Sequence, residues 1–194
     1  MIATVALSAL LSSCSPSVAP DTMRAIVAVE SGGHPTSVHD NDSGASYVPR
    51  DREEATRLAE ALIARGHSVD LGLGQVNSRN LAAYGVTPGE VLEPCRNLRV
   101  ASAILASDYR VASARFANVR AALTAAIGAY NTGSLFAGAS YVQAVVAAAM
   151  APRQLVPTIA ILTGGAPEER AAPLPSSPAP AARPVPTRIA WGRP

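Results

Sequence analysis

The chain has 194 residues, which allows one ordinary domain and a tail, and 48% of them are hydrophobic, which is enough to form a core. All 16 basic residues are arginine and 14 residues are acidic, so the net charge of +2 excludes the clustered basic surface of a nucleic-acid-binding protein. The absence of lysine excludes Schiff-base and P-loop chemistry, and abundant alanine with only 4% aromatic residues favours packed helices.

Residues 1–13 are apolar or small and lack the basic start of a signal peptide. They are expected to be either an atypical or truncated leader or the first helix of the domain. The sequence Leu11-Ser12-Ser13-Cys14 resembles a lipoprotein-processing box, and lipidation of Cys14 would prevent a disulfide there, but the missing basic start argues against this use. No run reaches the ~18–20 consecutive apolar residues of a membrane span.

Apolar residues then recur at helical spacing and predict one mainly α domain over residues 14–150. Asp21 or Thr22 is expected to cap the first of its helices. This helix is expected to end at Glu30, because Gly32 and Gly33 stop it. A small β-hairpin or loop element is expected near residues 37–71. Further helices are predicted over residues 51–65, 78–84, 98–116, 119–130 and 139–149, with a loop over 34–50 and a glycine-punctuated turn over 72–77.

The composition changes after residue 150, where the tail, residues 151–194, holds ten of the 16 prolines. Residues 167–186 are rich in proline and alanine with few large apolar side chains, so we expect them to be disordered or polyproline-like. A short apolar run, residues 158–162, is a candidate to dock on the domain as an extended segment.

Glu30 is the first residue that could carry chemistry. It ends an apolar helix, and Ile26, Val27 and Val29 would partly screen its carboxyl from water. Such screening favours the protonated form that a general acid needs. On this feature alone, an exposed glutamate at a helix end is the better interpretation.

Two later segments change that balance. Gly72-Leu73-Gly74-Gln75-Val76-Asn77 is a tight turn with amide side chains and open backbone, and Ala129-Tyr130-Asn131-Thr132-Gly133 ends a helix with a phenol and an amide. Amides, hydroxyls and backbone groups are the partners of sugar N-acetyl and hydroxyl groups. Either segment alone could be ordinary turn or cap chemistry.

Taken in order, Glu30-Ser31-Gly32-Gly33 and these two segments resemble the three signature motifs of lytic transglycosylases with a lysozyme-like fold. The similarity is strongest to the small members attached to type IV secretion and conjugation systems, and residues 14–20, 39–41, 46–50, 66–70 and 93–98 carry it further. The resemblance covers about residues 14–149 and implies an α+β lysozyme-like domain that acts on peptidoglycan glycan strands.

The resemblance also implies a mechanism that needs neither a cofactor nor a metal. The glutamate at the position of Glu30 would protonate the glycosidic oxygen between N-acetylmuramic acid and N-acetylglucosamine. It would then accept the proton of the muramic acid 6-hydroxyl, which closes a 1,6-anhydro ring. A second carboxylate is required only in an ordinary two-carboxylate glycosidase, for which Asp40, Asp42 and Asp70 are the candidates.

The same motifs assign roles to further residues. Tyr130 would lie against Glu30 and help to hold its carboxyl, and the glycines would let the backbone approach the glycan. Gly74 stands where relatives often have methionine or alanine, a departure expected to cost rigidity, and Thr132 stands where many have alanine. The residues expected to bind substrate or order the site are Ser31, Gly72, Leu73, Gly74, Gln75, Asn77, Tyr130 and Asn131.

The two cysteines, Cys14 and Cys95, form no CxxC motif, which excludes a zinc knuckle or a thioredoxin motif. The residues alone leave a disulfide and two unrelated thiols equally open. In the subgroup that the chain resembles, cysteines in these two contexts are expected to pair. The pairing would close a loop of about 80 residues, stabilise the fold by on the order of 4 kcal/mol and favour the periplasm or cell envelope.

Two other functions stay open on the sequence: a hydrolytic, lysozyme-type muramidase, and a non-catalytic wall-binding assembly factor of the secretion system. His34, His39, Asp40 and Asp42 are not expected to bind a metal, because the run that starts at Asp40 lacks the later ligands of a calcium loop. The expected partners are glycan strands and components of a type IV secretion system, and the chain is expected to be a monomer.

Overall fold

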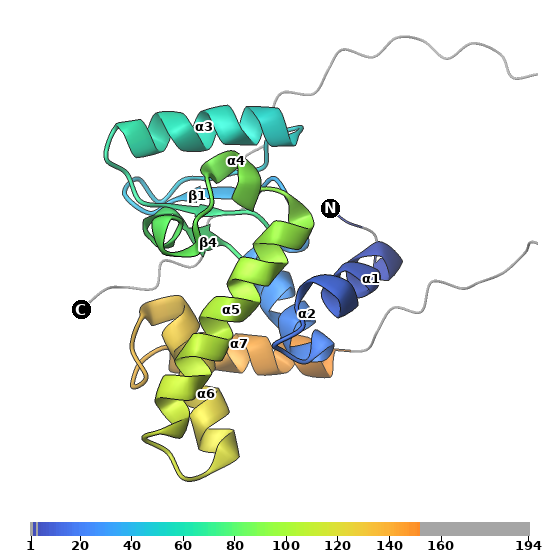
Figure 1. Ribbon diagram of the computed structural model, residues 1–194, viewed down its shortest axis with the longest axis vertical. Coiled ribbons are helices and arrows are strands. Elements are labelled where there is room, and N and C mark those ends of the chain that lie inside the picture. Colours follow the sequence, from blue (N-terminus) through green and yellow to red (C-terminus); the bar gives the residue numbers. More distant parts are fainter. Residues whose placement is uncertain (1, 3, 152–194) are drawn as a thin grey trace, which may run out of the picture.

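The computed structural model describes residues 2 and 4–151 (Figure 1). The two expectations for the tail, at residues 158–162 and 167–186, lie outside the described residues. The described part is mainly helical with one small antiparallel sheet, which confirms the predicted fold class. In chain order the elements are α1 (Thr4–Cys14), α2 (Pro20–Glu30), β1 (Val38–Asp40), β2 (Ser46–Tyr47), α3 (Arg52–Ala64), β3 (Val69–Leu71), β4 (Val76–Asn77), the 3-10 helices η1 (Ser78–Asn80) and η2 (Ala82–Tyr84), α4 (Pro88–Val91), α5 (Pro94–Ser113), α6 (Val119–Thr132) and α7 (Ala139–Met150).

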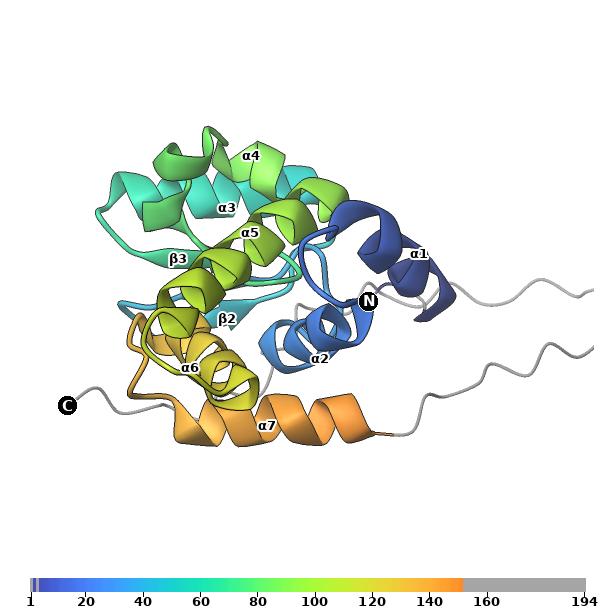
Figure 2. The same cartoon turned by 60° about the horizontal axis from the view of Figure 1, so that its bottom comes forward.

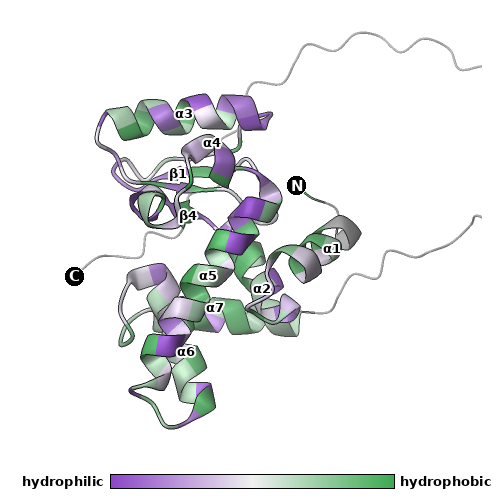
Figure 3. Cartoon of the chain, in the orientation of Figure 1, coloured by the Kyte–Doolittle hydropathy of each residue, from purple (hydrophilic) through white to green (hydrophobic). Residues whose placement is uncertain are grey.

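The sheet has the strand order β2-β1-β3-β4, and every neighbouring pair is antiparallel. Val38 pairs with Leu71, and Leu71 pairs with Val76. The buried Leu71 thus sets the register of β1 and β4 on either side of β3. Helix α3 is amphipathic (Figure 3) and packs on β1 and β3. The predicted β element is therefore present, and it extends past residue 71 to include β4.

Helix α5 connects the sheet region to the other helices (Figure 1). It contacts β4 and α4 on the sheet side, and it packs against α1 and, most extensively, α6. Its polar first turns give way to a hydrophobic middle (Figure 3), where Leu98, Ala101 and Leu105 are buried. Helices α2 and α7 lie side by side (Figure 2), so the end of α2 is brought close to residues far along the chain.

Several helix boundaries differ from those predicted. Residues 4–14 form α1, which packs against α2 and α5, and the choice between a leader and the first helix of the domain stays a prediction. Helix α2 begins at Pro20, and its cap residue Ala19 makes no side-chain bond, so the predicted capping is wrong. Helix α5 begins four residues earlier than predicted, because Glu93 accepts hydrogen bonds from the first amides and Pro94 occupies the first helical position, where its missing N–H costs nothing.

No helix among the described residues is long and apolar enough to cross a membrane.

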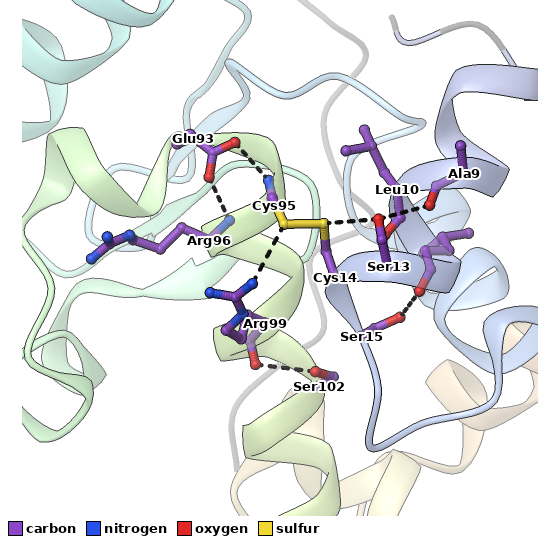
Figure 4. Close-up of a disulfide and its surroundings, with 11 residues drawn as sticks. Ala9, Leu10, Ser13, Cys14, Ser15, Glu93, Cys95, Arg96, Arg99 and Ser102 are labelled. Carbon is purple, nitrogen blue, oxygen red and sulfur yellow. Dashed lines mark hydrogen bonds between the residues drawn. A yellow bond between two sulfur atoms is a disulfide. The ribbon is translucent and has the colours of Figure 1, made fainter.

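The predicted disulfide is confirmed: Cys14 at the end of α1 is bonded to Cys95 in the first turn of α5, 81 residues later (Figure 4). The carboxylate of Glu93 holds that turn by accepting from the Cys95 and Arg96 amides at 3.0 and 2.7 Å. Cys14 is buried and disulfide-bonded, so its sulfur is not available for lipidation in this structure.

Candidate active site

Glu30 is the last residue of α2, and only 8% of its surface is exposed. Tyr141, in the first turn of α7, donates a hydrogen bond from its Oη to Glu30 Oε1 at 2.6 Å. The tyrosine is itself 2% exposed, and the contact follows from the packing of α2 on α7. A buried carboxyl without such a partner would cost free energy. Tyr141 was not among the residues predicted from the sequence, where its only signal is a phenol on an apolar helix that would need a partner when buried.

Ser31 ties the end of α2 to the glycine-rich turn after β3. Its Oγ donates to the carbonyl oxygen of Leu73 at 2.8 Å and lies 3.2 Å from that of Val27, and it accepts from the amide of Gly33 at 3.2 Å. Two of the three predicted segments are therefore joined directly, one residue after the carboxylate. This contact fixes the turn relative to Glu30.

The turn at residues 72–75 is packed tightly against α5. Gly72 has φ +73°, and a side chain there would collide with Asn97. At Gly74, a Cβ atom would lie 2.6 Å from the Cβ of Ala101 and 3.0 Å from the Oη of Tyr130. In the structure, the approach that these glycines permit is to α5 and Tyr130, and the glycine at position 74 is what allows this packing.

Asn97 holds the same turn and was not singled out from the sequence. It is 1% exposed, its Oδ1 accepts from the Gly74 amide at 2.7 Å, and its Nδ2 donates to the carbonyls of Leu71 and Val91 at 2.8 Å each. The buried amide of Asn97 bonds to three backbone groups, so it fixes the turn and its own polar atoms are hydrogen-bonded as well. The available signal was an asparagine near the start of a long helix, one residue before the apolar Leu98.

Gln75 and Asn77, the two amide residues predicted in the segment 72–77, serve the fold in different ways. Gln75 adopts φ +49°, and its Nε2 donates to the Gly72 carbonyl at 2.8 Å and to the Ser37 carbonyl at 3.3 Å. Asn77 donates to Asp70 Oδ1 at 2.7 Å, and its own Oδ1 accepts from the Arg79 amide at 2.9 Å. Both side chains thus order the turn and its exit strand. Their predicted contact with substrate stays a prediction.

The third predicted segment meets the second through Tyr130. Its Oη donates to the carbonyl oxygen of Gly74 at 2.6 Å. Asn131 follows it, half-buried, and Gly133 ends α6 with φ +73°. The structure therefore brings Glu30, the turn and the end of α6 together, whereas the predicted role of Tyr130 in holding the Glu30 carboxyl stays a prediction.

Asp40, Asp42 and His67 form the one group of described residues whose ligand atoms, all within 4.8 Å of one another, could hold a metal ion. Burial of Asp40 acts to raise its pKa, but hydrogen bonds from Ser43, His67 and the Asp42 amide outweigh it and hold the pKa at about 2. Asp42 accepts from the amide of Ser68 at 2.7 Å. These bonds join the loop after β1 to the loop before β3, so the cluster has a structural explanation without a metal.

Asp108 is a further carboxyl that sequence analysis missed. On α5 it follows Asn97, Ala101 and Ile104 at the spacing of one helix face, the face that holds the turn. It is half-buried, and burial raises its pKa to about 6. Burial and then the nearby Asp108 charge also raise the pKa of Tyr84 in η2. Asp108 is therefore a carboxyl on α5 that lies near Tyr84 of η2 and has a pKa of about 6.

The arrangement is suited to general acid–base chemistry at one carboxyl. A single buried glutamate is oriented by a buried tyrosine and lies next to a turn whose backbone is fixed by Ser31, Asn97 and Tyr130. Rigid placement of the proton donor is what such catalysis requires.

Comparison with known proteins agrees with this arrangement. The family model described as "Transglycosylase SLT domain" matches residues 11–144. The chain is 40% identical over 148 residues to "Protein virB1" of Agrobacterium fabrum, covering 75% of this chain and 59% of that protein. It is 39% identical over 148 residues to "Type IV secretion system protein virB1" of Brucella abortus, covering 72% of this chain and 62% of that protein. The matched part thus spans about three fifths of the length of these relatives, and no solved structure matches the chain.

Proposed function

Because this chain belongs to the transglycosylase SLT domain family, we propose that it is a peptidoglycan lytic transglycosylase. It cleaves the β-1,4 bond between N-acetylmuramic acid and N-acetylglucosamine and leaves a 1,6-anhydromuramic acid end. The name of the Brucella abortus relative, a type IV secretion system protein, supports the further proposal that the cleavage opens the cell wall for such an apparatus. The disulfide supports a location in the periplasm or cell envelope.

The observation that carries the proposal is the buried Glu30 carboxyl held by the Tyr141 hydroxyl at 2.6 Å. Protonated Glu30 gives its proton to the glycosidic oxygen as the bond from that oxygen to the muramic acid C1 breaks, and N-acetylglucosamine leaves with a free hydroxyl. The carboxylate then takes the proton of the 6-hydroxyl, whose oxygen forms the new bond to C1. The proton balance closes on one residue, and no water is consumed.

The neighbouring residues have positioning roles in this proposal. Tyr141 sets the orientation of the carboxyl, and Ser31 keeps the turn at residues 72–75 against it. Gln75, Asn77, Tyr130 and Asn131 order the surroundings or bind the sugars. The binding of the muramic acid beside the turn would keep its 6-hydroxyl close to C1, which favours ring closure over attack by water.

The test is mass spectrometry of the products that the purified protein releases from peptidoglycan. We expect muropeptides that are lighter by one water than hydrolysis products and that resist borohydride reduction. Glu30→Gln should abolish them, whereas Glu60→Gln, the same change on the exposed side of α3, should leave them unchanged. Reducible ends would instead identify a hydrolytic muramidase, and a folded, disulfide-bonded protein that releases nothing would favour the assembly-factor role.

A further inference from the structure

An apolar groove of about 530 Å³ lies between the first half of α6 and the segment that joins α6 to α7. Its walls include the only two phenylalanines of the chain, whose ring centroids are 6.1 Å apart. Phe136 is 76% exposed although it is one of the largest apolar side chains. The groove is lined mainly by apolar residues, among them Phe116, Leu135, Phe136 and Ala139, and also by the polar residues Asn118 and Arg120.

The groove is separate from the candidate active site. Ala121, one of its α6 residues, lies on the face of the helix opposite to Tyr130, because the nine residues from one to the other amount to two and a half turns (~3.6 residues per turn). The other wall is rigidly placed: Gly128 lies so close to the carbonyl of Ala137 that a side chain there would collide with it. The groove is therefore a fixed apolar feature on the outer side of α6.

A continuous exposed stripe leads from the end of α7 to this groove. Ala139, Gln143, Val146 and Met150 follow one another at helix-face spacing, and all four are exposed, Val146 at 48% and Met150 at 80%. Three of the four are apolar. Arg24 of α2 fixes the far end of the stripe by donating to the carbonyls of Ala148 and Ala149 at 3.3 and 3.1 Å. An exposed apolar stripe that ends in an apolar groove indicates a surface that is covered by another segment.

The chain that continues after Ala151 has the length to be that segment. The apolar run at residues 158–162 begins seven residues later. Helix α7 spans roughly 16 Å from Met150 back to Ala139. Seven residues reach at most about 25 Å when extended, and a coil of that length has a mean end-to-end distance of about 15 Å. The linker length thus matches the span, which is the condition under which a tethered segment has its highest effective concentration.

We propose that residues 158–162 dock in this groove of the same chain, after the tail has turned back along the α7 stripe. Ile159, Ile161 and Leu162 supply the large apolar side chains that the groove accommodates. Residues 167–186 are less suited, because they contain few large apolar side chains and begin farther along the chain from Ala151. The docked run packs on the segment that connects Asn131 to Tyr141, so it stabilises the link between two parts of the candidate active site.

The test is photo-crosslinking in the full chain. Phe136 is replaced by p-benzoyl-phenylalanine, and crosslinked peptides are mapped by mass spectrometry in an equal mixture of ¹⁴N- and ¹⁵N-labelled protein. We expect crosslinks to residues 158–162 within one chain. The same photoreactive residue at Tyr47, an exposed aromatic position on β2, should give none to that run.

Two tail variants provide the specificity control. Ile159→Asp combined with Leu162→Asp should lower the yield of the Phe136 crosslink at least tenfold, whereas Leu174→Asp, in the proline-rich part, should leave it unchanged. The reverse placement, with the photoreactive residue at Ile159, should label residues 116–139 and so does not depend on tolerance of the change at Phe136. Crosslinks between ¹⁴N and ¹⁵N chains, crosslinks to residues 167–186, no crosslinks to the tail, or a yield unaffected by the aspartates would each overturn the proposal.

Discussion

Gly74→Ala is the substitution for which the structure gives the sharpest expectation. The added Cβ would lie 2.6 Å from the Cβ of Ala101 and 3.0 Å from the Oη of Tyr130, whereas carbon atoms in contact are normally ~3.5–4.0 Å apart. The turn and α5 would have to separate by roughly 1 Å, and overpacking of this kind costs about 1–3 kcal/mol. Loss of glycine flexibility in the unfolded chain offsets up to ~1 kcal/mol, so a net loss of about 1–2 kcal/mol is expected.

A double-mutant cycle tests the stated cause of that loss. Ala101→Gly removes the colliding methyl group and alone should cost about 1 kcal/mol as a glycine inside a helix. Combined with Gly74→Ala, it should restore stability relative to the sum of the single changes by roughly 1 kcal/mol or more. The assay is urea unfolding followed by circular dichroism with the disulfide intact. Ala103→Gly, on another side of α5, should show no coupling. If Gly74→Ala were as stable as the wild type, or the cycle showed no coupling, the packing argument would be wrong.

Three further expectations follow from the contacts around the site. Tyr141→Phe should lower kcat/KM on peptidoglycan by about 10–100-fold with little change in fold, because Glu30 loses a buried hydrogen bond of roughly 1–3 kcal/mol; unchanged kinetics would contradict this role. Asp40→Asn should destabilise the protein by about 2 kcal/mol at pH 7 in urea unfolding. Since the folded pKa of about 2 lies below the usual 3.8, the difference between the two proteins should shrink as the pH falls from about 4 towards 2, and a pH-independent difference would exclude a charge effect. Reduction of Cys14–Cys95, or Cys14→Ser, should lower stability by roughly 4 kcal/mol, which a thermal melt with and without reductant measures; equal melting temperatures would show that the long loop adds no constraint.

Local signals in the sequence account for most of the helices and for the three segments that meet at the site. The helix predicted over residues 51–65, for example, is found as α3, and Asp51 caps it by accepting from the amide of Glu54. The predicted start of α5 at residue 98 is wrong, because Glu93 followed by Pro94, a side-chain acceptor followed by proline, begins the helix four residues earlier. Where two local signals for a helix start lie close together, as they do here, packing against the rest of the fold decides which of them begins the helix.

The residues that sequence analysis missed are those whose roles depend on distant partners. Tyr141 bonds to a residue 111 positions earlier, and Asn97 bonds to the backbone of residues 23 and 26 positions earlier. Neither belongs to a local pattern that announces a buried hydrogen bond. Gly74 shows the same limit: its sequence context gives a turn, but the need for glycine arises from Ala101 and Tyr130 on other elements.

The bond between Cys14 and Cys95 also makes the protein a covalent ring from which two arms extend. Glu30, Ser31, the whole sheet and the turn at residues 72–75 belong to the ring, whereas Tyr130 and Tyr141 belong to the C-terminal arm. A protease that cuts once anywhere between the two cysteines would therefore leave a single particle, heavier only by the one water that hydrolysis adds, with both pieces still joined until a reductant is added. The piece that carries Glu30 would therefore stay attached to the piece that carries Tyr130 and Tyr141 after such a nick.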